Sequence, residues 1–194
     1  MTFPLGGHET TANGLVWAAY LLGQHPEAQA RIAAEAREVS AGEAPSFDYL
    51  PRLTYTEKVM REALRLYPPA WYLTRRADED VDVGGYRIPK GTTVVMNLWG
   101  LHRDPRFYPD PNAFRLERWT PEFVKGLPQL TYMPFGVGPR RCIGASFANG
   151  DAHRAGGNRP TVLPGVCTGS NGDSAGGHYP APARRREGCP ARPQ

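Results

Sequence analysis

The chain has 194 residues and a formal net charge of +4 at pH 7, so it has room for one domain with a tail, and its charge does not indicate a nucleic-acid partner. Its three cysteines are an odd number and argue against a disulfide framework. No apolar run has the length of a membrane span or the form of an export signal. We therefore expect a cytoplasmic protein with no membrane span and no nucleic-acid partner.

Two regions differ in composition. Residues 1–148 show the patterns of a mainly α-helical chain with a small β-sheet, whereas residues 149–194 are rich in Gly, Pro, Ala and Arg and poor in aromatic and branched apolar residues. Such a segment cannot bury enough apolar surface to offset the entropy of ordering it. We expect a folded part over 1–148 and a disordered tail over 149–194.

The first expected helix opens at Gly6 and runs to about Gly23. Within it, Glu9 and Thr10 place a carboxylate next to a hydroxyl, a pair that can pass protons. A threonine and paired glycines can also widen a helix groove, because the hydroxyl competes for backbone hydrogen bonds. A helix N-cap with an acidic first turn is the alternative interpretation.

Two further helices follow. Pro26 suits the first position of a helix, whose residues 27–39 alternate charges with alanines and indicate a solvated helix without chemistry. Thr54 and Glu57 form a capping-box pattern for the next helix, which Pro68 ends.

Strand patterns come next. Residues 70–74 form an extended apolar run that ends in Arg75 and Arg76, and a plain strand with an exposed arginine is one interpretation. The Gly-Gly pair inside 81–88 predicts a tight hairpin, and residues 92–98 predict another strand. Together these segments predict the small sheet.

Residues 135–144 place one cysteine, Cys142, among glycines and arginines. Glycine lets a backbone approach a flat ring closely, while Arg140, Arg141 and a helix beginning at Ile143 would favour the thiolate. The pattern suits a thiolate held against a large anionic cofactor. A buried loop cysteine without a ligand is the alternative.

This loop resembles the cysteine-ligand loop of the cytochrome P-450 family, whose pattern Phe-x-x-Gly-x-Arg/His-x-Cys-x-Gly is matched by Phe135, Gly138, Arg140, Cys142 and Gly144. Three more family motifs occur in the family's order and extend the resemblance over residues 3–148. They are Gly6-Gly7-His8-Glu9-Thr10, the Glu62-x-x-Arg65 pair with Tyr67-Pro68-Pro69, and 114–119, where Leu116 replaces the usual proline. We expect more than half of a full-length member to be missing on the N-terminal side.

The resemblance implies a partial cytochrome P-450 fold, the haem-binding C-terminal part. Cys142 would be the ligand of the iron of haem b, with Phe135, Gly138, Arg140 and Gly144 around the haem. Arg75, or Arg76 as its competitor, would meet a propionate, and Glu9 and Thr10 would relay protons. Glu62, Arg65 and Arg118 would form a buried structural network, and His102, which stands alone in sequence, is predicted to be a hydrogen-bonded structural residue.

The activity implied is that of a haem-thiolate monooxygenase, which inserts one oxygen atom from O2 into a small apolar organic substrate. Electrons would come from NAD(P)H through a ferredoxin or a flavoprotein reductase. A haem-thiolate isomerase or peroxygenase, and an inactive truncated fragment, are alternatives. For the tail we hypothesise a reading-frame change near Asn149 in a GC-rich gene, with a genuine disordered tail as the other interpretation.

Overall fold

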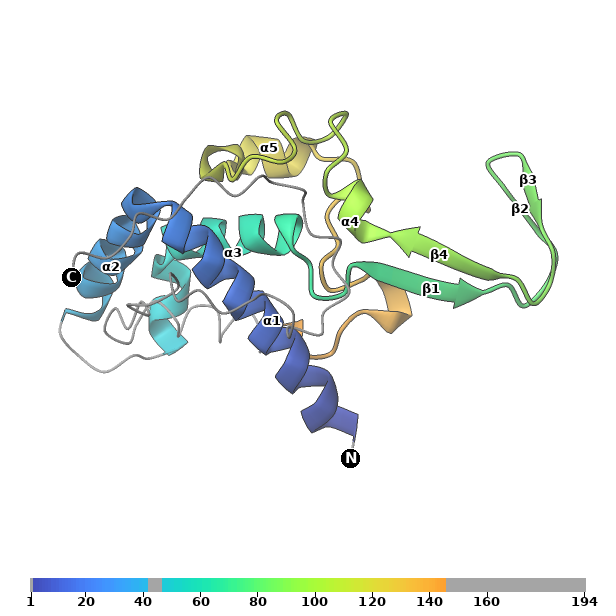
Figure 1. Ribbon diagram of the computed structural model, residues 1–194, viewed down its shortest axis with the longest axis horizontal. Coiled ribbons are helices and arrows are strands. Elements are labelled where there is room, and N and C mark those ends of the chain that lie inside the picture. Colours follow the sequence, from blue (N-terminus) through green and yellow to red (C-terminus); the bar gives the residue numbers. More distant parts are fainter. Residues whose placement is uncertain (1, 42–46, 146–194) are drawn as a thin grey trace, which may run out of the picture.

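The computed structural model describes residues 2–41 and 47–145 of the chain (Figure 1). The predicted tail, its reading-frame hypothesis and the 148/149 boundary lie outside these residues. The helices are α1 (Thr2–Gln24), α2 (Pro26–Ser40), α3 (Thr54–Leu66), α4 (Leu98–Leu101) and α5 (Pro121–Gly126), with 3-10 turns at Phe47–Arg52, Leu116–Arg118 and Gly138–Arg140. The strands are β1 (Tyr72–Arg76), β2 (Val81–Val83), β3 (Tyr86–Ile88) and β4 (Thr93–Asn97). The expectation of a mainly helical chain with a small β element is confirmed.

Helices α1 and α3 cross each other and bury apolar side chains between them (Figure 1). Ala18 and Leu21 of α1 pack with Ala63 and Leu66 of α3 in one cluster. At its edge the rings of Trp17 and Tyr67 stack with centroids 4.0 Å apart and planes 5° from parallel. Small residues at the crossing let the helices come close, and the burial of this cluster fixes α3 on α1.

Helix α2 packs on the other half of α3 through Ala28 and Val59, and Leu116 from the later 3-10 turn completes this second cluster. The helix begins at Pro26, as the sequence predicts. Its C-terminal cap residue, Ala41, adopts a left-handed conformation with φ of 48°.

The predicted capping box at the start of α3 is wrong. Leu53 occupies the N-cap position, and Thr54 is already helical. The carboxylate of Glu57 pairs with Arg61, 2.7 Å away, instead of turning back to the helix start. The first-turn amides of Tyr55 and Thr56 are bonded to a carboxylate from α2, so no local cap is needed.

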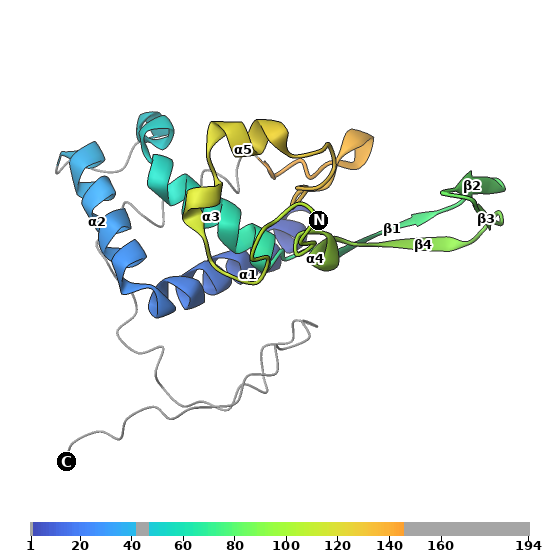
Figure 2. The ribbon, with the colours of Figure 1, turned by 90° about the horizontal axis from the view of Figure 1, so that it is seen from above.

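The strands form an arm that projects from the helices in both views (Figures 1 and 2). Strands β1 and β4 pair antiparallel from Tyr72↔Asn97 to Arg76↔Thr93. The predicted hairpin is present as β2 and β3, paired from Val81↔Ile88 to Val83↔Tyr86. The strands therefore make two separate two-stranded sheets rather than one.

Among the helices of the described residues, none combines the length and the hydrophobicity that crossing a bilayer requires.

Candidate functional site

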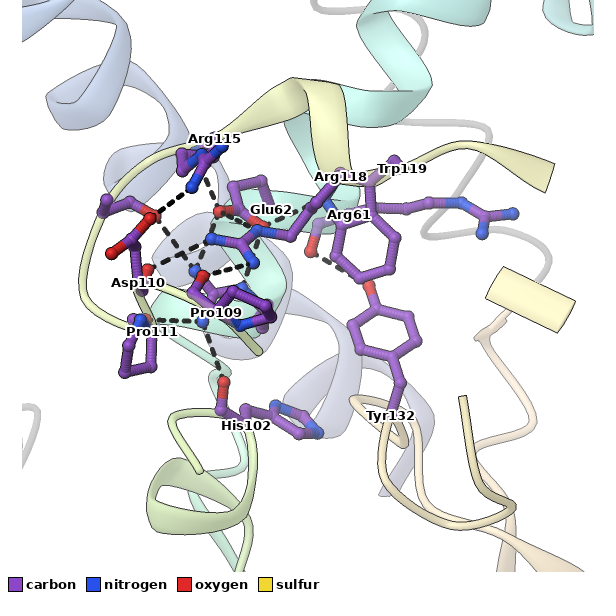
Figure 3. Close-up of polar contacts among 12 residues, drawn as sticks. Arg61, Glu62, His102, Pro109, Asp110, Pro111, Arg115, Arg118, Trp119 and Tyr132 are labelled. Atoms are coloured by element: carbon purple, nitrogen blue, oxygen red, sulfur yellow. Dashed lines mark hydrogen bonds and ion pairs between the residues drawn. The ribbon is translucent and has the colours of Figure 1, made fainter. Parts of the chain in front are cut away.

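The carboxylate of Glu62 is fully buried on α3 and is the centre of a polar network (Figure 3). Both of its oxygens accept from the guanidinium of Arg65, at 2.8 Å each. The remaining donors are Arg118 Nε at 3.2 Å, Trp119 Nε1 at 2.9 Å and the backbone N–H of Arg115 at 2.9 Å. The predicted Glu62, Arg65 and Arg118 network is confirmed as a physical cluster.

The two arginines also hold the irregular chain between α4 and the 3-10 turn at Leu116–Arg118 by its carbonyl groups. The guanidinium of Arg65 donates to the carbonyls of His102, Pro111 and Ala113 at 2.6–3.1 Å. That of Arg118 donates to the carbonyls of Pro109 and Asp110 at 2.9 and 3.1 Å. Each buried charge is therefore paired and hydrogen-bonded, which is the condition for burying it without a large penalty.

Two members of this network have no counterpart in the sequence-based prediction. Trp119 supplies an indole N–H, and Arg115 supplies its backbone amide rather than its side chain. A tryptophan beside a predicted buried arginine is a signal for the first, because a buried indole N–H usually finds an acceptor. Nothing in the sequence indicates the second.

Two contacts join the network to the segment that leads into the cysteine loop. The Tyr132 hydroxyl donates to the carbonyl of Arg61 on α3 at 3.1 Å, and burial raises the pKa of Tyr132. The backbone N–H of Met133 donates to Nε2 of His102 at 3.2 Å. The loop therefore starts from a point held to α3 and to the end of α4.

His102 is fully buried and hydrogen-bonded, which confirms its predicted structural role. Burial, aided by the nearby charge of Arg65, lowers the pKa of His102 to about 4. The ring is neutral at pH 7, and because Nε2 accepts, the proton resides on Nδ1. That atom has no hydrogen-bond partner among the described residues.

The cysteine loop closes on itself through its backbone. The N–H of Cys142 donates to the carbonyl of Phe135 at 2.8 Å, and the N–H of Arg141 donates to that of Gly138 at 3.0 Å. Gly136 and Gly138 both have φ of +68°, a left-handed conformation that other residues rarely adopt. This folding leaves the side chain of Cys142 exposed, so the burial assumed in the alternative interpretation is wrong.

Strand β1 lies beside the loop. A Cβ built on Gly136 would stand 3.7 Å from Cδ1 of Leu73. Arg75, two residues along the strand, shares that face with Leu73, and its guanidinium donates to the carbonyl of Thr74 at 2.8 Å. Arg76 lies instead by the turn before β4, where its Nη2 would be 3.5 Å from a Cβ on Gly91.

Glu9 and Thr10 lie inside α1, which already begins at Thr2, so the N-cap interpretation of this motif is wrong. The Thr10 hydroxyl donates to the carbonyl of Gly6 at 2.6 Å, which is the competing bond that the sequence predicts. Among the described residues no hydrogen bond or ion pair joins either side chain to the cysteine loop.

A cavity of about 520 Å³ separates α3 from the loop. One face of α3 forms one wall, with Met60 and Leu64, and Tyr132 to Gly138 form the other. Cys142 is not among the residues that line it, although its neighbour Arg141 is. The helix predicted from Ile143 does not begin there, because Ile143 and Gly144 form a turn; Ala145, the last described residue, is helical and buried.

The sequence model of the family described as Cytochrome P450 matches residues 1–152. Cyclooctatin synthase of Streptomyces melanosporofaciens is 47% identical over 152 residues, 78% of this chain and 33% of that protein. Cyclooctat-9-en-7-ol 5-monooxygenase of the same organism is 41% identical over 148 residues, 76% of this chain and 32% of that protein.

Among solved structures, the crystal structure of the cytochrome P450DA heme domain superposes with a TM-score of 0.76 at 37% identity. The match covers 80% of this chain and 35% of that one. The chain thus spans about a third of the length of these relatives. On its sequence and its fold, the chain belongs to the cytochrome P450 family.

Proposed function

We propose that this chain is the haem-binding part of a haem-thiolate monooxygenase, with Cys142 as the ligand of the iron of haem b. The observation that carries the proposal is the exposed thiol of Cys142 at the end of a loop that contains two glycines in the left-handed conformation. Membership of a haem family supports the choice of cofactor. A haem held there would supply the oxygen-activating chemistry.

The residues present fit such a group by the chemistry of their donors. The loop offers a single exposed thiol, and thiolate is a known axial ligand of haem iron. A Cβ on Gly138 would meet nothing within 4 Å, so the surface of the loop is open at that position. A Cβ on Gly144 would be in ordinary van der Waals contact with the sulfur of Cys142, at 3.8 Å, so this position lies directly beside the thiol.

Two arginines are proposed to bind the carboxylates of the cofactor. The guanidiniums of Arg75 and Arg140 are exposed, and guanidinium geometry suits a carboxylate. The position of Arg75 on the face of β1 that meets the loop favours it over Arg76. Phe135, whose carbonyl accepts from the amide of Cys142, is proposed to pack its ring beside the sulfur.

Glu9 and Thr10 are proposed to handle protons during the reaction. The hydroxyl proton of Thr10 is directed at the carbonyl of Gly6, so the lone pairs of its oxygen remain able to accept a hydrogen bond. The carboxylate of Glu9 is exposed one residue earlier and can exchange a proton with water.

The proposed reaction inserts one oxygen atom from O2 into a small apolar organic substrate and reduces the other to water. A relative named as a monooxygenase supports this reaction class. Electrons are proposed to come from NAD(P)H through a ferredoxin or a flavoprotein reductase, since members of the family generally use redox partners.

The test is a reduced carbon-monoxide difference spectrum of the full chain after reconstitution with haem. A thiolate-type band is expected in the wild type, in Cys167→Ala and in Cys189→Ala, and its loss is expected in Cys142→Ala. A band that survives in Cys142→Ala would assign the ligand to another residue, and a wild type that takes up no haem would support the inactive-fragment alternative.

A second measurement separates the reaction classes. In the protein loaded with haem, we compare product formation under two conditions: with O2 and an NAD(P)H-driven reductase, and with peroxide alone. We expect more product with the reductase. Glu9→Gln is expected to slow the reductase-driven reaction and to leave the carbon-monoxide band unchanged. Turnover with peroxide alone would favour a peroxygenase, and turnover without any oxidant an isomerase.

A further inference from the structure

The first turn of α3 is capped by a side chain from another helix. The first N–H groups of any helix lack partners inside the helix, and the N-cap side chain normally accepts from one of them. Here the N-cap residue is Leu53, which has no side-chain acceptor. The first bond within the helix runs from the N–H of Glu57 to the carbonyl of Leu53, at 3.0 Å.

The missing acceptor comes from Glu35, on α2. Its Oε1 accepts from the backbone N–H of Tyr55 at 2.6 Å, and its Oε2 accepts from that of Thr56 at 2.9 Å. Oε2 also accepts from the hydroxyl of Thr56 at 2.7 Å. Both oxygens are thus used, on the second and third amides of the helix, and the negative charge stands at the positive end of the helix dipole.

A second contact lies one turn earlier on the same face of α2. The guanidinium of Arg31 sits over the ring of Tyr55, 4.1 Å from its centroid. Residues four apart on a helix are neighbours, so Arg31 and Glu35 contact the first turn of α3 side by side. These contacts bridge about twenty residues of sequence and fix the start of α3 on α2.

Helix α3 then carries this position to the cysteine loop. Its middle holds the Glu62 carboxylate, and its Arg61 carbonyl accepts from the hydroxyl of Tyr132 at the loop's entrance. We propose that Glu35 is a positioning residue. It supplies the N-terminal cap of α3 and, through α3, holds the cysteine loop in place.

The test is amide hydrogen exchange of the full chain without haem, comparing wild type, Glu35→Ala and Glu35→Gln. In Glu35→Ala the amides of Tyr55 and Thr56 are expected to exchange about fivefold faster or more, as for the loss of a helix cap. A smaller acceleration is expected at Met133 and Cys142, whose amides are hydrogen-bonded in the loop and its approach. The amide of Tyr86 in the hairpin is expected to be unchanged.

Two further variants test whether faster exchange comes from the loss of the Glu35 carboxylate. Glu35→Gln keeps one carbonyl oxygen and should give an intermediate acceleration at Tyr55 and Thr56. Glu38→Ala, an exposed acid on the same helix, should change neither.

Unchanged exchange at Tyr55 and Thr56 in Glu35→Ala would overturn the cap. Faster exchange there with unchanged Met133 and Cys142 would overturn the positioning role. Uniform acceleration that includes the hairpin, in both Ala and Gln variants, would show a general loss of stability and would also overturn it.

Discussion

The Glu62 network and the cysteine loop lie next to each other and are built in opposite ways. In the network, the buried charges of Glu62, Arg65 and Arg118 are paired with one another and hydrogen-bonded to nearby backbone groups. In the loop, the thiol and the flanking arginines are exposed, and the shape comes from backbone bonds and two left-handed glycines. The Glu62 network carries no exposed thiol, and the cysteine loop has little side-chain packing of its own.

This difference shows that the stability of the fold and the chemistry of the site depend on different residues. A loop that exposes its thiol cannot bury enough side chain to hold itself, because its reactive face must stay open. Its position is therefore set by its neighbours, through Tyr132 on α3 and Met133 on His102. Breaking the network should lower the stability of the whole protein, whereas changing the loop should affect the site first.

The largest effect is expected from Glu62→Gln. This change removes the buried negative charge and leaves the guanidiniums of Arg65 and Arg118 without their partner, so we expect the free energy of unfolding to fall by roughly 3–5 kcal/mol. The matched control is Glu57→Gln on the same helix, which breaks an exposed pair with Arg61 and should cost about 0–1 kcal/mol. Urea denaturation measures both, and equal losses would contradict the comparison.

The next effect is a pH dependence that originates at His102. Its pKa is about 4 in the folded chain, against an ordinary value of 6.5, so the unfolded chain binds the proton more tightly and acid favours unfolding. Stability is complete above about pH 6.5 and falls towards pH 4, by roughly 3 kcal/mol from this group. Besides the ring of Tyr132, the groups facing it are the cations of Arg65 and Arg103.

Urea denaturation at several pH values, for wild type and His102→Gln, measures this contribution. The variant should be less stable at pH 7 and should lose less stability on acidification. Parallel curves for the two proteins would show that His102 does not carry the proton.

A smaller effect should follow from Trp119→Phe. The phenyl ring keeps most of the packing but lacks the N–H that donates to Glu62 at 2.9 Å. Losing a hydrogen bond to a charged group should cost roughly 2 kcal/mol. Trp99→Phe is the control, because Trp99 meets Arg103 through the face of its ring; similar losses in both would mean that ring size alone matters.

The smallest effect on stability, and the sharpest on the site, should come from Gly138→Ala. A left-handed alanine costs about 1 kcal/mol, and no neighbour crowds the added carbon. The loop is expected to shift. The affinity for haem should therefore fall markedly, while the free energy of unfolding changes by only about 1 kcal/mol. Gly126→Ala, at an uncrowded glycine without a positive φ, should change neither quantity; haem titration and denaturation of both variants check this.

The parts predicted best are those with a local signal. The hairpin follows from adjacent glycines between alternating residues, and α2 from its proline. Glu62 and Arg65 follow from the family's Glu-x-x-Arg motif, and Arg118 follows from the family motif at 114–119; the structure joins all three.

The parts missed are those in which distant segments supply one group each. Glu35 lies in a stretch of alternating charges that predicts only solvent exposure, and its partners come twenty residues later. The Thr54–Glu57 capping pattern was misleading for the same reason, since a carboxylate from elsewhere had already bonded the first turn. The bond from Met133 to His102 likewise depends on how two loops meet, which no local pattern encodes.

Arg65 and Arg118 hold the irregular chain between His102 and Ala113 mainly through its main-chain oxygens. The Tyr108 ring, whose centroid is 5.1 Å from the guanidinium carbon of Arg65, is the exception among the described contacts. This proline-rich segment forms no regular backbone hydrogen-bond pattern of its own. Hydrogen bonds from the two arginines to its carbonyl groups hold it in place, and such bonds do not depend on which side chains the segment carries. Apart from His102 and Tyr108, which are both fully buried, this stretch should tolerate broad substitution as long as its route stays the same. Saturation mutagenesis would then show permissive positions within this stretch and intolerance at Arg65 and Arg118, the two arginines that hold it.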